Sequence, residues 1–242
     1  MNKKNQIFLK NSFILSKKDI KNLLLQRNEL LSSLQKFFRK NLGRFIFTKL
    51  FIFFFVKKNI NKLYYKIIYK EFLLIKPFLK KAKRKKIFLG IGCGLGGLEV
   101  ILQKKIFNKS NFYLFERNFT SHKVVYGYDK SNKEAYNNIK ATNLFIEKNS
   151  IDKNKFKLFN IDQDKLPSVK FDVVVSILSL DYHYPFEVYY KYLKKNSSNS
   201  AIFIFDTIRP EYFKKIFKIV KIISIDNKKI HPSSRVYCKF FL

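Results

Sequence analysis

Glycines are concentrated in one short stretch of this chain. The sequence KKIFLGIGCGLGGLEVIL (85–102) holds five of the seven glycines found in all 242 residues. They are Gly90, Gly92, Gly94, Gly96 and Gly97. An apolar run precedes them and a run with helical spacing follows. Because glycine allows tight turns and lets a ligand approach the bare backbone, the stretch predicts a strand–turn–helix unit that cradles a ligand.

From residue 87 onward, strand-like and helix-like patterns alternate. We expect strands at 86–91, 111–116, 155–160, 171–180, 200–206, 218–225 and 234–241, and helices at 95–107, 130–149, 187–195 and 210–218. Only a short polar loop joins the last two strands, which predicts an antiparallel hairpin. The pattern therefore indicates an α/β fold, with a doubly wound, mostly parallel seven-stranded sheet that ends in this hairpin. In such a sheet the ligand lies outside the carboxyl ends of the strands.

The first third of the chain has a helical pattern. Ser16 and Asp19 form an S-x-x-D helix start, and apolar residues recur at helical spacing up to Gly43. A second helical stretch ends near Pro77, and the basic run LKKAKRKK (79–86) follows it. We expect a helical cap or lid over 1–86 and a ligand-binding domain over 87–242. A cap packed beside the domain is favoured over a substrate lid or a dimer face.

The formal net charge of +33 suggests a nucleic-acid partner, but the composition favours another explanation. Only seven of the 50 basic residues are Arg, which reads phosphate and guanine better than Lys does. The abundance of Lys, Asn, Ile and Phe is what A/T-rich codons produce. A solvated lysine surface is therefore favoured, and nucleic-acid binding stays open as an alternative.

The cysteines and the lengths of the apolar runs indicate where in the cell the protein is expected. Two cysteines, Cys93 and Cys238, form neither a disulfide framework nor a zinc motif, which indicates a reduced, cytoplasmic location. The longest apolar run, LFIFFFV (50–56), is much shorter than the ~20 residues that span a bilayer, so no transmembrane segment is expected. Peripheral contact with a membrane surface remains possible through basic runs. The His and Asp residues are too sparse to predict a metal site.

Two ligand classes fit the glycine turn. Gly92, Gly94 and Gly97 match the dinucleotide pattern G-x-G-x-x-G, which would suit a nicotinamide enzyme. GIGCGLG also resembles the D/E-x-G-x-G-x-G turn of class I S-adenosylmethionine (SAM) methyltransferases. The C-terminal hairpin and the sequence NIDQD after the third strand favour the methyltransferase interpretation. SAM is accordingly the expected cofactor.

The resemblance implies a set of cofactor-binding residues. Glu116, at the end of the second strand, would accept hydrogen bonds from the ribose diol, and Asp162 would meet the adenine amino group. The remaining positions are Gly90, Gly92, Cys93, Gly94, Gly96 and Ser176. The chain departs from the family at Gly90, where an acid that helps hold the methionine part of SAM is usual. This departure supports the alternative of a SAM-fold binding module without activity.

Residues 87–206 further resemble a bacterial group of sugar O-methyltransferases, through the glycine turn, FYLFERN, VVYGYDKSNKEAYNN and SILSLDYHYPFEVYYKYL. That resemblance implies methyl transfer to a hydroxyl of a sugar or similar small acceptor, in surface polysaccharide or glycolipid synthesis. The RNA methyltransferase alternative rests on the basic surface. The oligomeric state is left open.

Candidate catalytic residues follow the fourth strand, in SLDYHYP (179–185). His183 has the side chain best suited to remove a proton near neutral pH, and Asp181 would orient it or act as the base itself. The alternative is that this loop is only packed. Asp206 is expected to cap the next helix rather than to bind substrate. Asp129 is expected to start a helix, Tyr136 to pack and His231 to lie in an exposed turn.

Overall fold

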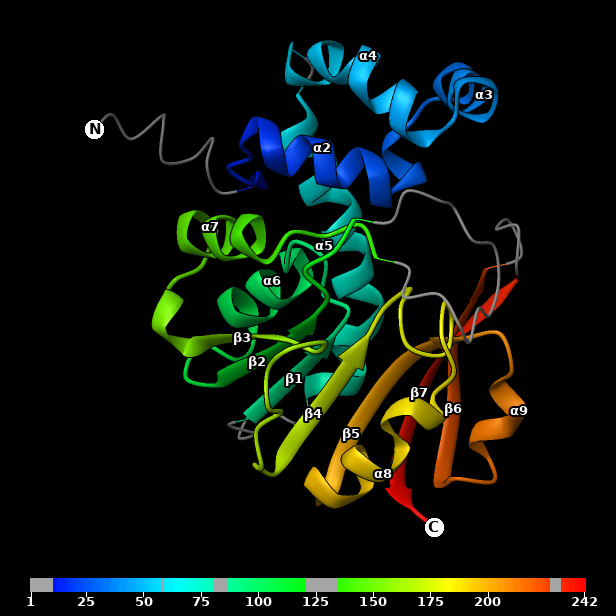
Figure 1. Cartoon of the computed structure of the whole chain (residues 1–242). Helices are drawn as coiled ribbons and strands as arrows, with labels where there is room; N and C mark the ends of the chain where they lie inside the picture. The colour runs from blue at the N-terminus through cyan, green and yellow to red at the C-terminus, as the bar shows by residue number, and fades with distance from the viewer. Residues whose placement is uncertain (1–10, 58, 81–86, 121–134, 227–231) are drawn as a thin grey trace.

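The computed structural model describes residues 11–57, 59–80, 87–120, 135–226 and 232–242. Its centre is a seven-stranded sheet (Figure 1). The strands are β1 (Ile87–Ile91), β2 (Asn111–Glu116), β3 (Phe156–Asn160), β4 (Phe171–Ser176), β5 (Ser197–Thr207), β6 (Phe217–Asp226) and β7 (Ser233–Phe241). All seven expected strands are present, because each is a run of apolar residues bounded by polar ones.

The strand order is β3-β2-β1-β4-β5-β7-β6. The first five strands pair in parallel, and β7 is antiparallel to both β5 and β6. This confirms the doubly wound sheet and its C-terminal hairpin. The order reverses between β1 and β4, so the carboxyl end of β1, where the glycines begin, lies at the switch point that binds ligands in open α/β sheets.

Alternate residues of each strand face two separate hydrophobic cores. Phe88, Leu114 and Val173 belong to one core, whereas Leu89 and Phe115 belong to the other. The first core is covered by α5 (Ile60–Leu79), α6 (Gly97–Lys105) and α7 (Ile139–Asn149). The second is covered by α8 (Glu187–Asn196) and α9 (Pro210–Phe213), on the opposite face of the sheet (Figure 1). Burial on both faces explains why these strands are apolar without alternation.

In Figure 1 the N-terminal helices lie above α7 and the upper end of α5. They are α2 (Lys17–Gln26), η2 (Asn28–Leu30), α3 (Ser33–Leu42) and α4 (Arg44–Lys57). Ser16 begins α2 through a capping box with Asp19, as the sequence predicts. Within the described residues the helical pattern up to Gly43 is divided, because Ser32 starts α3 with a second capping box.

Three predicted boundaries are corrected by the structure. Residues 130–134 of the helix expected over 130–149 lie outside the described residues, and α7 begins at Ile139, where the Asn138 side chain accepts a hydrogen bond from the backbone N–H of Ala141. The strand expected to reach residue 180 ends at Ser176, because Leu178 turns the backbone with φ 57°. The helix expected over 210–218 is the short α9, since Phe217 already belongs to β6. The helix expected to end near Pro77 is α5, which contains Pro77 and ends at Leu79.

The N-terminal segment and the sheet share the first core. Phe13 packs edge-on against Phe145 of α7, with ring centroids 5.1 Å apart. The Asn149 side chain bonds the backbone of Ile14 in both directions, accepting from its N–H at 2.7 Å and donating to its C=O at 2.9 Å. The boundary at residue 86 stays a prediction. None of the described helices is long and apolar enough to cross a membrane.

Candidate functional site

The glycine turn connects β1 to α6 through three left-handed residues. Gly92, Gly94 and Gly96 have φ of 64°, 59° and 81°, which side chains other than glycine adopt only with strain. The Gly92 N–H donates to the Phe115 carbonyl at 2.8 Å, and the Gly96 N–H donates to the Cys93 carbonyl at 2.9 Å. These hydrogen bonds hold the turn against the end of β2, so α6 begins at this edge of the sheet.

Glu116, the last residue of β2, lies against this turn. Its carboxylate accepts hydrogen bonds from the backbone N–H groups of Gly94 at 2.6 Å and Arg117 at 2.9 Å. Burial raises the pKa of the Glu116 carboxyl to about 7, against the effect of these donors. Asp162, in the turn after β3, lies 3.6 Å from the guanidinium of Arg117. The structure thus brings Glu116, Asp162 and the glycines to one edge of the sheet.

The side chain of Glu99 lies against Gly90, in the space that a side chain at position 90 would enter. A Cβ atom built on Gly90 would lie 2.9 Å from Oε1 of Glu99, which projects from the first turn of α6. Glu99 is 3% exposed, and no described partner bonds its Oε2 atom. Burial raises the pKa of its carboxyl to about 8. An acid is therefore present beside the glycine turn, although it comes from a helix instead of from β1.

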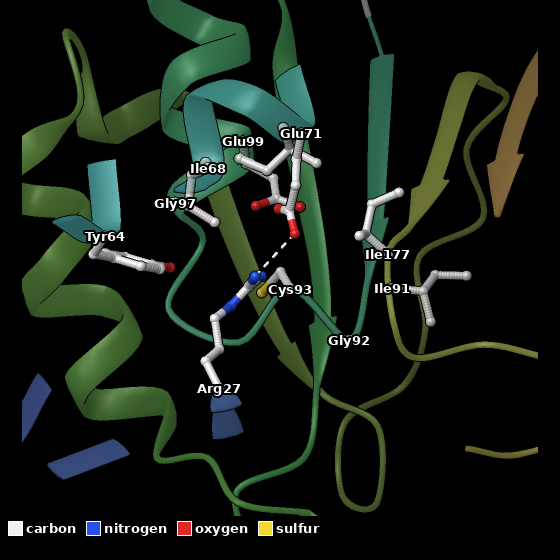
Figure 2. Close-up of a pocket in the computed structure, with 11 residues that line it drawn as sticks. Arg27, Tyr64, Ile68, Glu71, Ile91, Gly92, Cys93, Gly97, Glu99 and Ile177 are labelled. Carbon is white, nitrogen blue, oxygen red and sulfur yellow. Dashed lines mark hydrogen bonds and ion pairs between the residues drawn. The ribbon is translucent and has the colours of Figure 1, made fainter. Parts of the chain in front are cut away.

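Glu99 belongs to a buried polar cluster in a small pocket beside the turn (Figure 2). Arg27, just after α2, donates to Oε1 of Glu71 on α5 at 2.9 Å. The Oε2 atom of Glu71 is buried and has no hydrogen-bond partner among the described residues. Figure 2 shows the carboxylates of Glu71 and Glu99 lying together above Cys93. The hydroxyl of Tyr64 fits against Gly97, where an added Cβ would lie 2.6 Å from it.

The outer side of the glycine turn is covered by side chains of the chain itself. A Cβ on Gly92 would lie 1.8 Å from Oγ of Ser179, and one on Gly94 would lie 2.9 Å from Oε1 of Gln26. Ser179 shares a 3.0 Å hydrogen bond with the hydroxyl of Tyr184. The side chains of Ser179 and Gln26 thus occupy the space next to Gly92 and Gly94.

The loop after β4 is tightly held at its base. Ser176 donates to the Ile91 carbonyl at 2.8 Å and accepts from the Leu180 N–H at 2.9 Å, so its side chain braces the loop. Asp181 has φ 62° and is fully buried. Its carboxylate accepts from the Arg209 guanidinium at 2.6 Å, from the Thr207 hydroxyl and from the Phe186 N–H. These contacts indicate that Asp181 anchors the loop.

His183 lies at the exposed tip of the same loop. Its ring packs edge-on against that of Tyr182, with centroids 4.9 Å apart. Asp206 accepts from Arg235 of β7 at 2.7 Å and from the Leu178 N–H at 3.1 Å. The expectation that Asp206 caps the following helix is wrong, since α9 has no side-chain cap. Asp206 instead ties β5 to β7 and to the loop.

Tyr136, Asp129 and His231 are the other residues for which the sequence predicts a role. Tyr136 packs against the cap, with the guanidinium of Arg44 over its ring at 4.5 Å, as the packing interpretation predicts. Its carbonyl accepts a hydrogen bond from Gln26 at 2.7 Å. Asp129 and His231 lie outside the described residues. Within the described part of the chain, no group of His, Cys, Asp and Glu is arranged to hold a metal ion.

Comparisons with known proteins identify the fold. No family model matches the sequence, and no curated protein matches it significantly. Two solved segments of "StiE O-MT", residues 961–1257 and 942–1257, align at 11% and 10% identity, covering 90% and 92% of this chain and 90% of each segment, with TM-scores of 0.51 and 0.50. A methyltransferase from Pyrococcus furiosus aligns at 15% identity over 72% of this chain and 83% of its own, with a TM-score of 0.45.

The chain has the Rossmann-like methyltransferase fold. The residues at its switch point also suit SAM in their chemistry. A left-handed glycine turn and Glu116 are in place for a nucleoside, and Glu71 and Glu99 carry buried, unpartnered carboxylate oxygens near Arg27 for an amino-acid group. Methionine carries one ammonium and one carboxylate, and the carboxyl oxygens of Glu71 and Glu99 and the guanidinium of Arg27 are groups that hydrogen-bond to them.

Several of these residues were not anticipated from the sequence. Arg27, Glu71 and Tyr64 lie far from the glycines in the chain, and nothing in their local sequence indicates that they meet there. Glu99 carried a usable signal, because it is an acid in the first helical turn behind the glycines. Ser179 precedes the predicted catalytic pair, but its contact with Gly92 follows only from the turn at Leu178.

Proposed function

We propose that this protein is a SAM-dependent methyltransferase that transfers a methyl group to a hydroxyl of a sugar or similar small acceptor. The observation that supports this proposal most directly is the arrangement where β1, β2 and α6 meet. There the left-handed glycine turn lies next to Glu116 and to the buried Arg27–Glu71–Glu99 cluster. The fold shared with the StiE O-MT segments supports an O-directed reaction. The cytoplasm is the proposed location, since Cys93 and Cys238 are both free thiols.

The roles of the residues follow from their positions. When bound, SAM supplies an electrophilic methyl group on a sulfonium centre. Glu116 would accept hydrogen bonds from the ribose hydroxyls, and Asp162 from the adenine amino group. Arg27 would bind the methionine carboxylate, while Glu99, in place of the acid absent at position 90, would bind its ammonium group. His183 would take the proton of the acceptor hydroxyl as the acceptor oxygen bonds to the methyl carbon, while the bond from that carbon to sulfur breaks and S-adenosylhomocysteine leaves.

Calorimetric titration with SAM, S-adenosylhomocysteine and NAD tests the cofactor. We expect binding of the first two in the micromolar range and none of NAD. Glu116→Gln should weaken SAM binding about tenfold or more, because one charge-assisted hydrogen bond is lost. Glu147→Gln is the matched control, because Glu147 pairs with Lys153 on the surface of α7. Absence of SAM binding, or NAD binding in its place, would overturn the proposal.

A second measurement tests the catalytic assignment. His183→Ala should lower methyl transfer to nucleotide-sugar acceptors about 100-fold and leave the dissociation constant of SAM unchanged. Equal transfer rates would remove His183 from the mechanism without affecting the cofactor assignment.

An RNA methyltransferase is the alternative suggested by the charge of +33, and it would bind RNA with an affinity that falls steeply as salt increases.

A binding module without activity is the second candidate. The observation that favours it is the packing of Ser179 and Tyr184 on Gly92, which fills the cradle with the chain's own side chains. Ser179→Gly removes the side chain that covers Gly92. If the proposed enzyme opens this loop, Ser179→Gly should strengthen SAM binding. If the cradle is permanently closed, neither form should bind SAM.

A further inference from the structure

Helix α4 is apolar on nearly all sides, yet it lies at the surface. Its sequence is RFIFTKLFIFFFVK, and Phe47, Ile52 and Phe55 form the side that faces the first core. The opposite side is equally apolar, with Phe53 and Phe54 61% and 65% exposed. A helix that is hydrophobic all round is normally buried on all sides. The outer side of α4 therefore lacks a covering surface within the described residues.

The exposed side of α4 continues onto α3. Ring contacts connect the two helices, from Phe37 to Phe38 at 6.0 Å, Phe38 to Phe51 at 5.8 Å and Phe51 to Phe54 at 5.8 Å. We call this surface the α3–α4 face. Its exposed members are Leu34, Phe37, Phe38, Ile46, Leu50, Phe53 and Phe54. Figure 1 shows α3 and α4 as the outermost elements of the cap, on the side away from the sheet.

The charges around the α3–α4 face have one sign. Residues 30–70 contain ten Lys or Arg and no Asp or Glu. Lys36, Lys40 and Lys49 are exposed on these two helices, and the ammonium of Lys17 lies 4.3 Å from the ring centre of Phe53. Exposed apolar side chains beside basic residues, with no acid among them, are typical of a surface that lies in the headgroup region of a membrane.

We propose that the α3–α4 face docks on the surface of an anionic lipid bilayer. The apolar side chains would enter the boundary between headgroups and acyl chains, and the lysines around them would pair with lipid phosphates. In this arrangement the apolar side chains are buried and the positive charges of the lysines are neutralised. The proposal is independent of the proposed methyltransferase activity, because it rests on residues outside the glycine-turn site.

Other occupants suit this face less well. A second copy in a symmetric dimer would place lysines opposite lysines, with no acid between residues 30 and 70 to neutralise them. RNA would satisfy the lysines but leave Leu34, Ile46 and Leu50 against a polyanion. An anionic bilayer is the partner that buries the apolar groups and neutralises the charge together.

Vesicle flotation of the full chain tests the proposal. We expect binding to vesicles of phosphatidylglycerol and phosphatidylcholine, and at least tenfold weaker binding to phosphatidylcholine alone. Phe53→Ser combined with Phe54→Ser should weaken partitioning about 100-fold, because two large apolar groups no longer enter the bilayer. Ile151→Ser combined with Val188→Ser is the matched control, since these side chains are 61% and 62% exposed on other elements. The control should bind vesicles like the unaltered protein.

Folding of both double variants is checked by thermal unfolding, which should be unchanged because all four side chains are exposed. Failure of the unaltered protein to bind anionic vesicles would overturn the proposal. Equal binding by the Phe53–Phe54 variant would overturn it as well, since attraction by lysines alone would then explain the binding. A dimer seen by ultracentrifugation and lost in that variant, without vesicle binding, would assign the face to a second copy.

Discussion

Replacing Glu99 by Gln should stabilise the protein, and the gain should grow with pH. Burial holds the pKa of the Glu99 carboxyl at about 8 in the folded chain, against about 4.5 when it is unfolded. Between these values the folded protein keeps a proton that the unfolded chain has already released. Stability therefore falls as pH rises from about 4.5 to about 8. Gln at this position has the shape of the protonated acid and does not titrate.

The size of the effect follows from the pKa difference. Each pH unit between the two values contributes about 1.4 kcal/mol. At pH 7, about 2.5 units above the unfolded value, Glu99→Gln should raise the free energy of unfolding by about 3 kcal/mol. Below pH 4 both forms of the protein are neutral at this position, and the difference should vanish. Urea unfolding at pH 4, 5.5, 7 and 8.5 measures this profile.

Glu71→Gln provides a matched comparison with the opposite expected sign. Glu71 lies in the same cluster but pairs with Arg27 at 2.9 Å, and both side chains are largely buried. Removing one partner of a buried ion pair leaves the other charge uncompensated, at a cost of about 3 kcal/mol or more. The reasoning is refuted if Glu99→Gln has the same effect at pH 4 and pH 7, or if it destabilises the protein as Glu71→Gln does.

Two further substitutions test the turn and the loop. Gly92→Ala should lower the free energy of unfolding by about 2–4 kcal/mol, because the new Cβ meets Ser179 at 1.8 Å as well as the left-handed backbone. Gly96→Ala is the control, because Gly96 also has a positive φ but an added Cβ would have its nearest contact at 3.4 Å. Urea unfolding should show that this variant loses only about 1 kcal/mol of unfolding free energy. Equal losses in the two variants would exclude the contact with Ser179 as the cause. Asp181→Asn should destabilise the protein by about 3 kcal/mol, since Arg209 loses a buried partner, whereas the exposed Asp162→Asn should change the melting temperature little.

The sequence predicted the sheet well because its strands are buried on both faces and end at polar residues. β2 agrees with the predicted range 111–116 at both ends, and β3 begins one residue late. β1 agrees with its predicted range from residue 87 onward, and residue 86 lies outside the described residues. The helices were placed less well where side-chain caps decide the ends. Asn138 caps α7, which therefore begins only at Ile139, and Ser32 with Gln35 starts α3 through an S-x-x-Q capping box.

The candidate site was predictable only where it is local in the chain. The glycine turn and Glu116 belong to neighbouring strands of a fold whose order was expected, and they meet as anticipated. Arg27 and Glu71 are 44 residues apart and meet only because η2, which directly follows Arg27, packs against α5. The anchoring role of Asp181 depends on Thr207, the last residue of β5, and on Arg209 just after that strand, so the loop sequence alone did not indicate it.

The two hydrogen bonds between Ile14 and Asn149 join residues 135 positions apart. A chain made from its N-terminus exposes the apolar helices of the cap long before α7 exists to receive Phe13. Contacts of such long sequence separation close late and slowly. During synthesis the N-terminal helices, free of acids over 30–70, are therefore complete before α7 is made, which follows β1 and β2 in the chain. The surface that receives Phe13 is absent over that interval, so the order of synthesis constrains this protein as well as the stability of its final fold.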